Sequence, residues 1–122
     1  MRILVAEDEI MMLKTIDFRL RKDGYEVFLA EDGKEALEKI EELSPDLIIT
    51  DIMMPYASGL EIIGFVRKNK DKKVPIIILS AMGQEDVVLE AFQLGADDYI
   101  TKPFSPNELS VRVKRLIANN SH

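Results

Sequence analysis

Three acidic residues follow two apolar runs of the chain. Glu7 and Asp8 come after the run Ile3–Val5, and Asp51 comes after the run 47–50. Such a run indicates a buried strand, where an unpaired carboxylate is costly, so acids gathered at strand ends suggest a site. Two of these charges roughly 5 Å apart would repel by about 3 kcal/mol at an effective dielectric constant of about 20. A cation must offset this repulsion, and a set of oxygen ligands favours a hard divalent ion such as Mg²⁺.

A hydroxyl and an ammonium group follow two later runs. Ser80 ends the run that begins at Ile76, and Lys102 comes soon after the run 97–100. A metal and a lysine suit a dianionic phosphoryl group, with the serine as a hydrogen-bond donor. Asp51 is the natural nucleophile, because a carboxylate can attack phosphorus to form an acyl phosphate. The sequence has neither a P-loop nor a Gly-rich dinucleotide turn, so a nucleotide is not the obvious phosphoryl donor.

The apolar runs alternate with helical patterns along the whole chain. Strands are predicted over 2–6, 25–30, 46–50, 74–79 and 97–100, and helices over 9–22, 33–43, 58–69, 84–93 and 105–118. Ser58 and Ser105 each precede a glutamate by three residues, which is typical of a capping box at a helix start. Gly24 and Gly95 follow the first and fourth helices, where a left-handed cap is expected.

This alternation predicts one α/β domain over residues 1–122. Strict strand–helix alternation implies a parallel sheet with helices on both faces. Five such units in a short chain favour a flavodoxin-like, doubly wound five-stranded parallel sheet of order 2-1-3-4-5, because a barrel needs roughly twice the residues. In that order ligands bind outside the carboxyl ends of strands 1 and 3. Those ends carry the three acids.

Composition excludes several classes of protein. The net charge is −6 and no Lys/Arg cluster tracks phosphates, so direct binding of nucleic acid is not expected. The chain contains no cysteine, which excludes disulfides and thiolate sites. No signal peptide or membrane-spanning run is apparent, so we expect a cytoplasmic domain without membrane contact.

Four segments at successive strand ends make the chain similar to the response regulator receiver domains of two-component signalling. They are Ile3–Glu9, Asp51–Pro55, Leu79–Ala81 and Thr101–Phe104. The resemblance implies that Asp51 accepts a phosphoryl group from the phosphohistidine of a partner histidine kinase or phosphotransfer protein. It also implies that Glu7, Asp8, Asp51 and the Met53 main-chain carbonyl hold Mg²⁺, while Ser80 and Lys102 contact the phosphoryl oxygens.

The same resemblance implies a conformational switch. In the family, Tyr99 turns inward as Ser80 moves, which alters the face formed by the fourth helix, fifth strand and fifth helix. The domain would catalyse its own phosphotransfer and dephosphorylation without being an enzyme on other substrates. Residues 95–104 look most like the winged-helix transcription-factor branch, whose members form homodimers through that face.

The chain departs from the family pattern at Glu7 and Glu90, and Ser80 replaces the threonine of many relatives while keeping the hydroxyl. Glu7 stands where aspartate is commoner. Glu90 stands where a basic residue usually meets the glutamate that is here Glu108, so this pair would repel and the homodimer would be weakened. Arg112 still has Asp97 or Asp98 available as a partner.

Other interpretations of these residues are open at this point. Glu7 and Asp8 could cap the first helix. Tyr99 could simply pack on an edge strand with its hydroxyl group in contact with water. The chain could also be an aspartyl-phosphate-forming phosphatase, although haloacid-dehalogenase-like enzymes carry their nucleophile after the first strand. A third possibility is an interaction module that works without phosphorylation, for which Asp51→Asn would leave partner binding unchanged.

Overall fold

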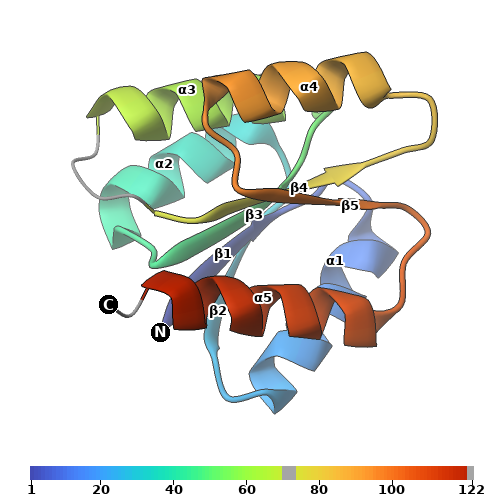
Figure 1. The fold of residues 1–122 in the computed structure, drawn as a ribbon. Coiled ribbons are helices and arrows are strands. Elements are labelled where there is room, and N and C mark those ends of the chain that lie inside the picture. The colour runs from blue at the N-terminus through green and yellow to red at the C-terminus, as the bar shows by residue number, and fades with distance from the viewer. Residues whose placement is uncertain (70–73, 121–122) are drawn as a thin grey trace.

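The computed structural model describes residues 1–69 and 74–120. Strands and helices alternate along them (Figure 1). The strands are β1 (Arg2–Ala6), β2 (Glu26–Ala30), β3 (Leu47–Asp51), β4 (Ile76–Ser80) and β5 (Asp98–Thr101). The helices are α1 (Ile10–Lys22), α2 (Gly33–Leu43), α3 (Gly59–Asn69), α4 (Glu85–Leu94) and α5 (Pro106–Asn120).

The strands form one parallel sheet in the order β2-β1-β3-β4-β5. This confirms the predicted flavodoxin-like topology. β3 and β4 each extend one residue beyond the predicted end, because Asp51 pairs with Leu79 across the ladder and Ser80 pairs with Thr101. Asp51 and Ser80 are therefore the last residues of buried strands, not the first residues of loops.

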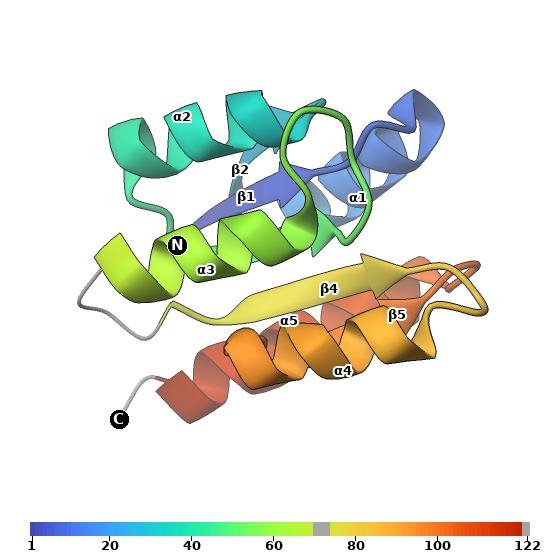
Figure 2. The same cartoon turned by 90° about the horizontal axis from the view of Figure 1, so that it is seen from above.

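Helices cover both faces of the sheet. α2, α3 and α4 lie on one face, with α3 between the other two, and α1 and α5 lie on the opposite face (Figures 1 and 2). Leu4, Ile48 and Ile78 point toward the first group of helices, whereas Ile3, Ile49 and Ile77 point toward the second. Every residue of β3 and β4 is buried. Their continuous apolar runs follow from this burial on both sides.

The predicted turn and cap residues take the expected conformations. Gly24 and Gly95 have φ angles of +99° and +120°, so both follow their helices in the left-handed region that favours glycine. The Ser58 hydroxyl accepts a hydrogen bond from Glu61 N–H (3.3 Å), and the Ser105 hydroxyl accepts one from Glu108 N–H (3.1 Å). Within the described ranges, no helix is long and apolar enough to cross a membrane.

Candidate functional site

The three acids meet at the carboxyl ends of β1 and β3. Ala6 is in register with Thr50, so the residues that follow these two positions emerge side by side. One carboxylate oxygen each from Glu7, Asp8 and Asp51 lies within 4.8 Å of the others. Glu7 and Asp51 are buried, and Asp8 is exposed. The structure thus brings together the three side chains that the topology places at one edge of the sheet.

Lys102 reaches into the same cluster from the end of β5. Its Nζ atom lies 3.0 Å from Asp51 Oδ2 and 2.8 Å from Glu7 Oε1. Its main-chain N–H donates a hydrogen bond to the Ser80 carbonyl at 2.7 Å. This bond ties the lysine to the end of β4, so four strand ends contribute to one site.

Burial sets the electrostatics of this cluster. Loss of hydration raises the pKa of Glu7 to about 7, against the opposing effects of hydrogen bonds from Lys102 and from the Glu9 main chain. For Lys102, burial acts to lower the pKa, but hydrogen bonds to Glu7 and Asp51 outweigh it and raise the pKa above its ordinary value. The lysine therefore stays positively charged beside a carboxyl group that ionises with difficulty.

The donor set fits a hard divalent cation. Glu7 Oε2 accepts a hydrogen bond from Glu9 N–H at 3.1 Å. Glu7 Oε1 is buried and, in the described part of the chain, lies at ion-pair distance from Lys102 without a well-directed hydrogen bond. An incompletely satisfied buried oxygen next to two more carboxylates is what a cation such as Mg²⁺ would complete. Glu7, Asp8 and Asp51 would hold it, and the Met53 carbonyl remains a predicted ligand.

The structure gives little support to helix capping as the role of these acids. The N-cap of α1 is Glu9, whose side chain makes no capping hydrogen bond. Glu7 contacts the start of α1 through its hydrogen bond from Glu9 N–H. Its carboxylate is otherwise directed at Lys102, so capping does not account for its position.

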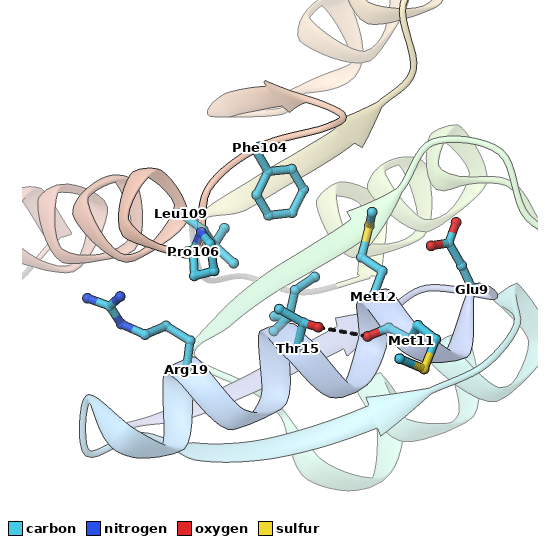
Figure 3. Close-up of a pocket in the computed structure, with 9 residues that line it drawn as sticks. Glu9, Met11, Met12, Thr15, Arg19, Phe104, Pro106 and Leu109 are labelled. Carbon is cyan, nitrogen blue, oxygen red and sulfur yellow. Dashed lines mark hydrogen bonds between the residues drawn. The ribbon is translucent and has the colours of Figure 1, made fainter.

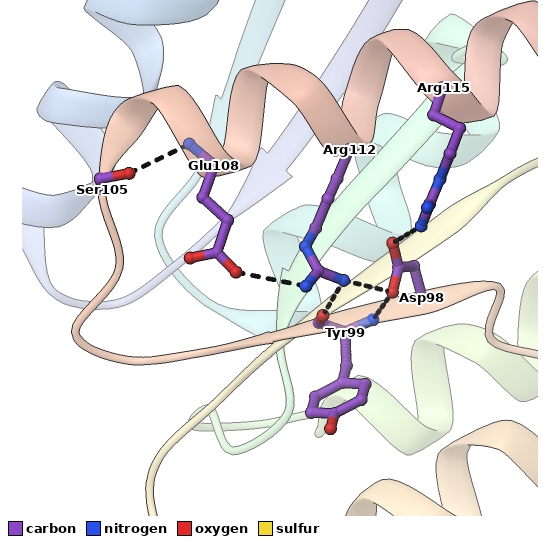
Figure 4. Close-up of polar contacts among 6 residues, drawn as sticks. All are labelled: Asp98, Tyr99, Ser105, Glu108, Arg112 and Arg115. Carbon is purple, nitrogen blue, oxygen red and sulfur yellow. Dashed lines mark hydrogen bonds and ion pairs between the residues drawn. The ribbon is translucent and has the colours of Figure 1, made fainter.

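Ser80 and Tyr99 lie on adjacent strands. Ser80 is buried at the end of β4. Tyr99 is 41% exposed, and its ring packs edge-to-face on Phe92 of α4, with ring centroids 5.8 Å apart. The Tyr99 ring thus points away from α5 (Figure 4). The proposed inward movement of Tyr99 stays a prediction.

The outer side of β5 and α5 carries an ion-pair network that the sequence indicated only in part (Figure 4). Of the two acids available to Arg112, the structure selects Asp98, at 2.8 Å, and Arg112 also pairs with Glu108 at 3.2 Å. Asp98 receives a second cation, Arg115, at 3.3 Å. Asp97 instead pairs with Arg67 at the end of α3, at 2.9 Å. Sequence reasoning missed Arg67 and Arg115, because long arginine side chains can reach several strands.

A hollow of about 220 Å³ was not anticipated from the sequence (Figure 3). It lies between α1 and the segment that enters α5, and its lining includes Met12, Thr15, Phe104 and Leu109. Glu9 at its rim follows the acids of the cluster, and Phe104 follows Lys102 closely in the chain. The apolar residues at 11, 12 and 104 were the only signal in the sequence that could have located it.

Comparison with known proteins gives the family. The model of the response regulator receiver domain matches residues 3–114. The chain is 42% identical over 116 residues to the alkaline phosphatase synthesis transcriptional regulatory protein PhoP of Bacillus subtilis strain 168, covering 95% of this chain and 48% of that protein. It is 44% identical over 117 residues to the response regulator RR06 of Streptococcus pneumoniae serotype 2, covering 96% and 53%. The chain thus spans about half the length of these curated relatives.

Two solved structures agree with this relation over the whole fold. The Francisella response regulator 1452 receiver domain superposes with a TM-score of 0.89 at 38% identity, covering 98% of each chain. The receiver domain of a signal transduction histidine kinase from Syntrophus aciditrophicus gives a TM-score of 0.90 at 30% identity, covering 99% of this chain and 92% of that one. With four strand ends forming one acidic site and a family match over nearly its full length, the chain belongs to the response regulator receiver domain family of two-component systems.

Proposed function

We propose that this receiver domain is a phosphorylation switch in which Asp51 accepts a phosphoryl group from the phosphohistidine of a partner histidine kinase or phosphotransfer protein, with Mg²⁺ as the cofactor. The observation that carries the proposal is the position of Lys102, whose Nζ lies 3.0 Å from Asp51 Oδ2 where three carboxylates meet. A nucleophilic carboxylate, a fixed cation and an oxygen-rich metal site in one place suit phosphoryl transfer.

The proposed transfer step uses the side chains of this site. A carboxylate oxygen of Asp51 attacks the phosphorus, and the bond from phosphorus to the imidazole nitrogen of the donor breaks. The leaving nitrogen keeps the electron pair, and the imidazole takes up one proton from water. Lys102 donates a hydrogen bond to a phosphoryl oxygen, and the Ser80 hydroxyl donates to another. A Mg²⁺ ion held by Glu7, Asp8, Asp51 and the Met53 carbonyl would supply the positive charge that offsets the phosphoryl charge.

The switch proposed for Ser80 and Tyr99 has a direct physical route. Ser80 pairs with Thr101 across the ladder, and its carbonyl accepts the hydrogen bond from Lys102 N–H. A shift of Ser80 toward a phosphoryl group on Asp51 therefore pulls on β5, which carries Tyr99. Movement of Tyr99 would alter the face formed by α4, β5 and α5 and so shift the balance between two conformations.

We extend the proposal to partners and place in the cell. The domain would act in the cytoplasm, and it would make no direct contact with nucleic acid itself. A homodimer through α4, β5 and α5 is expected to be weak. Glu90 would repel Glu108, and Arg112 already pairs with Asp98 and Glu108 of its own chain.

Mass spectrometry of the intact protein tests the phosphorylation step. Incubation with Mg²⁺ and a small acyl phosphate should add the mass of one phosphoryl group to the native chain. The isosteric Asp51→Asn variant should gain none, and chelation of Mg²⁺ should abolish the gain in the native chain. An equal gain in Asp51→Asn would contradict the assignment of the acceptor.

A turnover assay separates this function from a phosphatase. The receiver should not turn over an external phosphomonoester many times, and with a small acyl phosphate it should release phosphate only at the rate at which its own aspartyl phosphate hydrolyses. Multiple turnover would instead support an aspartyl-phosphate-forming hydrolase. Partner binding that is identical for native protein and Asp51→Asn, with and without phosphoryl donor, would support the phosphorylation-independent module.

A further inference from the structure

The Glu7 carboxylate is held from two directions in a fully buried position. Oε2 accepts the hydrogen bond from Glu9 N–H, at 3.1 Å. Oε1 lies 2.8 Å from Lys102 Nζ. Glu7 has no surface exposed to water. Before any external cation arrives, Oε2 is therefore hydrogen-bonded within this chain, and Oε1 is ion-paired with Lys102 but lacks a well-directed hydrogen bond in the described residues.

Lys102 is shared between two members of the acid cluster. Besides the Glu7 contact, its Nζ lies 3.0 Å from Asp51 Oδ2. One ammonium group thus bridges two of the three carboxylates that would hold a divalent cation. Since opposite charges at this separation attract strongly in a poorly hydrated site, Lys102 supplies part of the positive charge that the cluster needs.

The length of the Glu7 side chain makes this bridge possible. Aspartate at this position would be shorter by one methylene group, which is roughly 1.5 Å of chain. Its carboxylate would remain at the end of β1 but would withdraw from the 2.8 Å contact with Lys102. Asp51 would then be the remaining partner of the ammonium group.

We propose that the Lys102 ammonium competes with a divalent cation for the Glu7 carboxylate, so that residue 7 sets the cation affinity of the receiver through its reach to Lys102. Direct binding of a cation by Glu7 requires the Glu7–Lys102 ion pair to open. The proposal rests on the proposed function, because it takes the acid cluster as the Mg²⁺ site. Glutamate at position 7 therefore lowers the affinity for the cation. Lys102 becomes available to a phosphoryl oxygen only after the cation has bound the Glu7 carboxylate.

Calorimetric titration with Mg²⁺ tests this competition without measuring phosphorylation. Four metal-stripped proteins are compared: native, Glu7→Asp, Lys102→Met and the double variant. We expect Glu7→Asp to bind Mg²⁺ roughly tenfold more tightly than the native chain. Lys102→Met should tighten binding strongly in the native background and much less in the Glu7→Asp background, which is the non-additivity of a direct interaction.

Controls separate this interaction from general effects. Glu9→Asp shortens the neighbouring exposed side chain by the same methylene group and should leave the affinity unchanged. Circular dichroism and urea unfolding establish that each variant is folded. If Lys102→Met does not fold, the Mg²⁺ affinities of the native protein and Glu7→Asp still test the inference, because Glu7→Asp keeps the charges of residues 7 and 102.

Three outcomes would overturn the inference. Glu7→Asp could bind Mg²⁺ no more tightly than the native chain. Lys102→Met could change the affinity by the same factor in both backgrounds, which would indicate a general charge effect. Mg²⁺ could also fail to bind any of the four proteins. In that case, phosphorylation of Asp51 by a small acyl phosphate would show whether the proposed function holds without this inference. Conversely, the four proteins could bind Mg²⁺ with the expected affinities while Asp51 is not phosphorylated. That result would support the competition between Lys102 and the cation and would contradict the proposed function.

Discussion

A β-carbon on Gly33 would lie 1.9 Å from the carbonyl oxygen of Ala57. Gly33 is the first residue of α2, and its N–H donates a hydrogen bond to the Pro55 carbonyl at 3.1 Å. The start of α2 is therefore packed directly on the backbone of the loop between β3 and α3. That loop also carries Met53, whose main-chain carbonyl is a predicted cation ligand, so the contact with α2 bears on the position of this residue.

Gly33→Ala should destabilise the fold and displace this loop. Backbone atoms cannot rotate away as a flexible side chain can, so we expect a loss of about 1–3 kcal/mol in the free energy of unfolding. Urea denaturation measures it. Gly64→Ala is the matched control, because a β-carbon there meets no atom within 4 Å and the residue lies inside α3. The control should be stabilised by roughly 0.5–1 kcal/mol, and equal effects at both positions would contradict the packing argument.

Tyr56 occupies an unfavourable backbone conformation at the same loop. Its φ angle is +73°, and the Pro55 carbonyl accepts a hydrogen bond from Ala57 N–H at 2.9 Å, which closes a tight turn around Tyr56. Its side chain is 82% exposed, so the ring contributes little packing. Tyr56→Gly should therefore be more stable than Tyr56→Ala by about 1 kcal/mol, since both lose the ring but only glycine tolerates this φ angle. Thermal unfolding of the two variants checks this difference, and a more stable alanine variant would show that the turn rearranges.

The fold was predictable because its main signals are local. Continuous apolar runs mark buried parallel strands, serine caps and positive-φ glycines mark helix ends, and strict alternation leaves few topologies. The convergence of Glu7, Asp8 and Asp51 followed from topology alone, because residues that end neighbouring parallel strands share one edge.

Side-chain contacts between distant segments were not predictable in the same way. The bridge from Lys102 to Glu7 depends on side-chain length and rotamer in a buried pocket. The choice of Asp98 by Arg112 depends on where β5 begins, because successive residues of an extended chain point to opposite sides and Asp97 precedes the strand. Tyr56 even contradicts a local rule, since tyrosine is rarely found at positive φ.

Arg67 joins three segments at the opposite end of the sheet. Its guanidinium group donates hydrogen bonds to the carbonyls of Val74 (2.8 Å) and Gly95 (2.8 and 3.1 Å) and pairs with Asp97 at 2.9 Å. Lysine keeps the charge but cannot serve these acceptors together, so Arg67→Lys should cost about 1–3 kcal/mol in urea denaturation. Arg115→Lys alters a single, more exposed ion pair and should change stability by less than about 0.5 kcal/mol. Equal losses at the two positions would show that the planar geometry of Arg67 is not important.

Asp23 links α1 to α5 in a way that depends on pH. The Ser110 hydroxyl donates a hydrogen bond to Asp23 Oδ2 at 2.7 Å, and Arg19 pairs with the same carboxylate at 3.2 Å. The hydrogen bond from Ser110 is the main cause that lowers the pKa of Asp23 below its ordinary 3.8, and Arg19 adds to it. Because the native pKa is below the unfolded one, the native state favours the ionised carboxylate. This stabilisation is present above pH 3.8 and is lost as the pH falls through the lowered pKa.

Ser110→Ala should therefore destabilise the protein by about 1–2 kcal/mol at pH 7, since it removes a hydrogen bond to a charged group. The difference from the native chain should narrow as the pH falls below 3.8 and through the lowered native pKa of Asp23, since the carboxylate is then protonated in both proteins. Urea denaturation at a series of pH values from neutral to acidic measures this difference. In an Asp23→Asn background the same serine substitution should have an effect that does not change with pH, because the carboxylate that titrates is gone. A difference between native and Ser110→Ala that stays constant with pH while Asp23 is present would show that the hydroxyl acts through packing and not through the charge of Asp23.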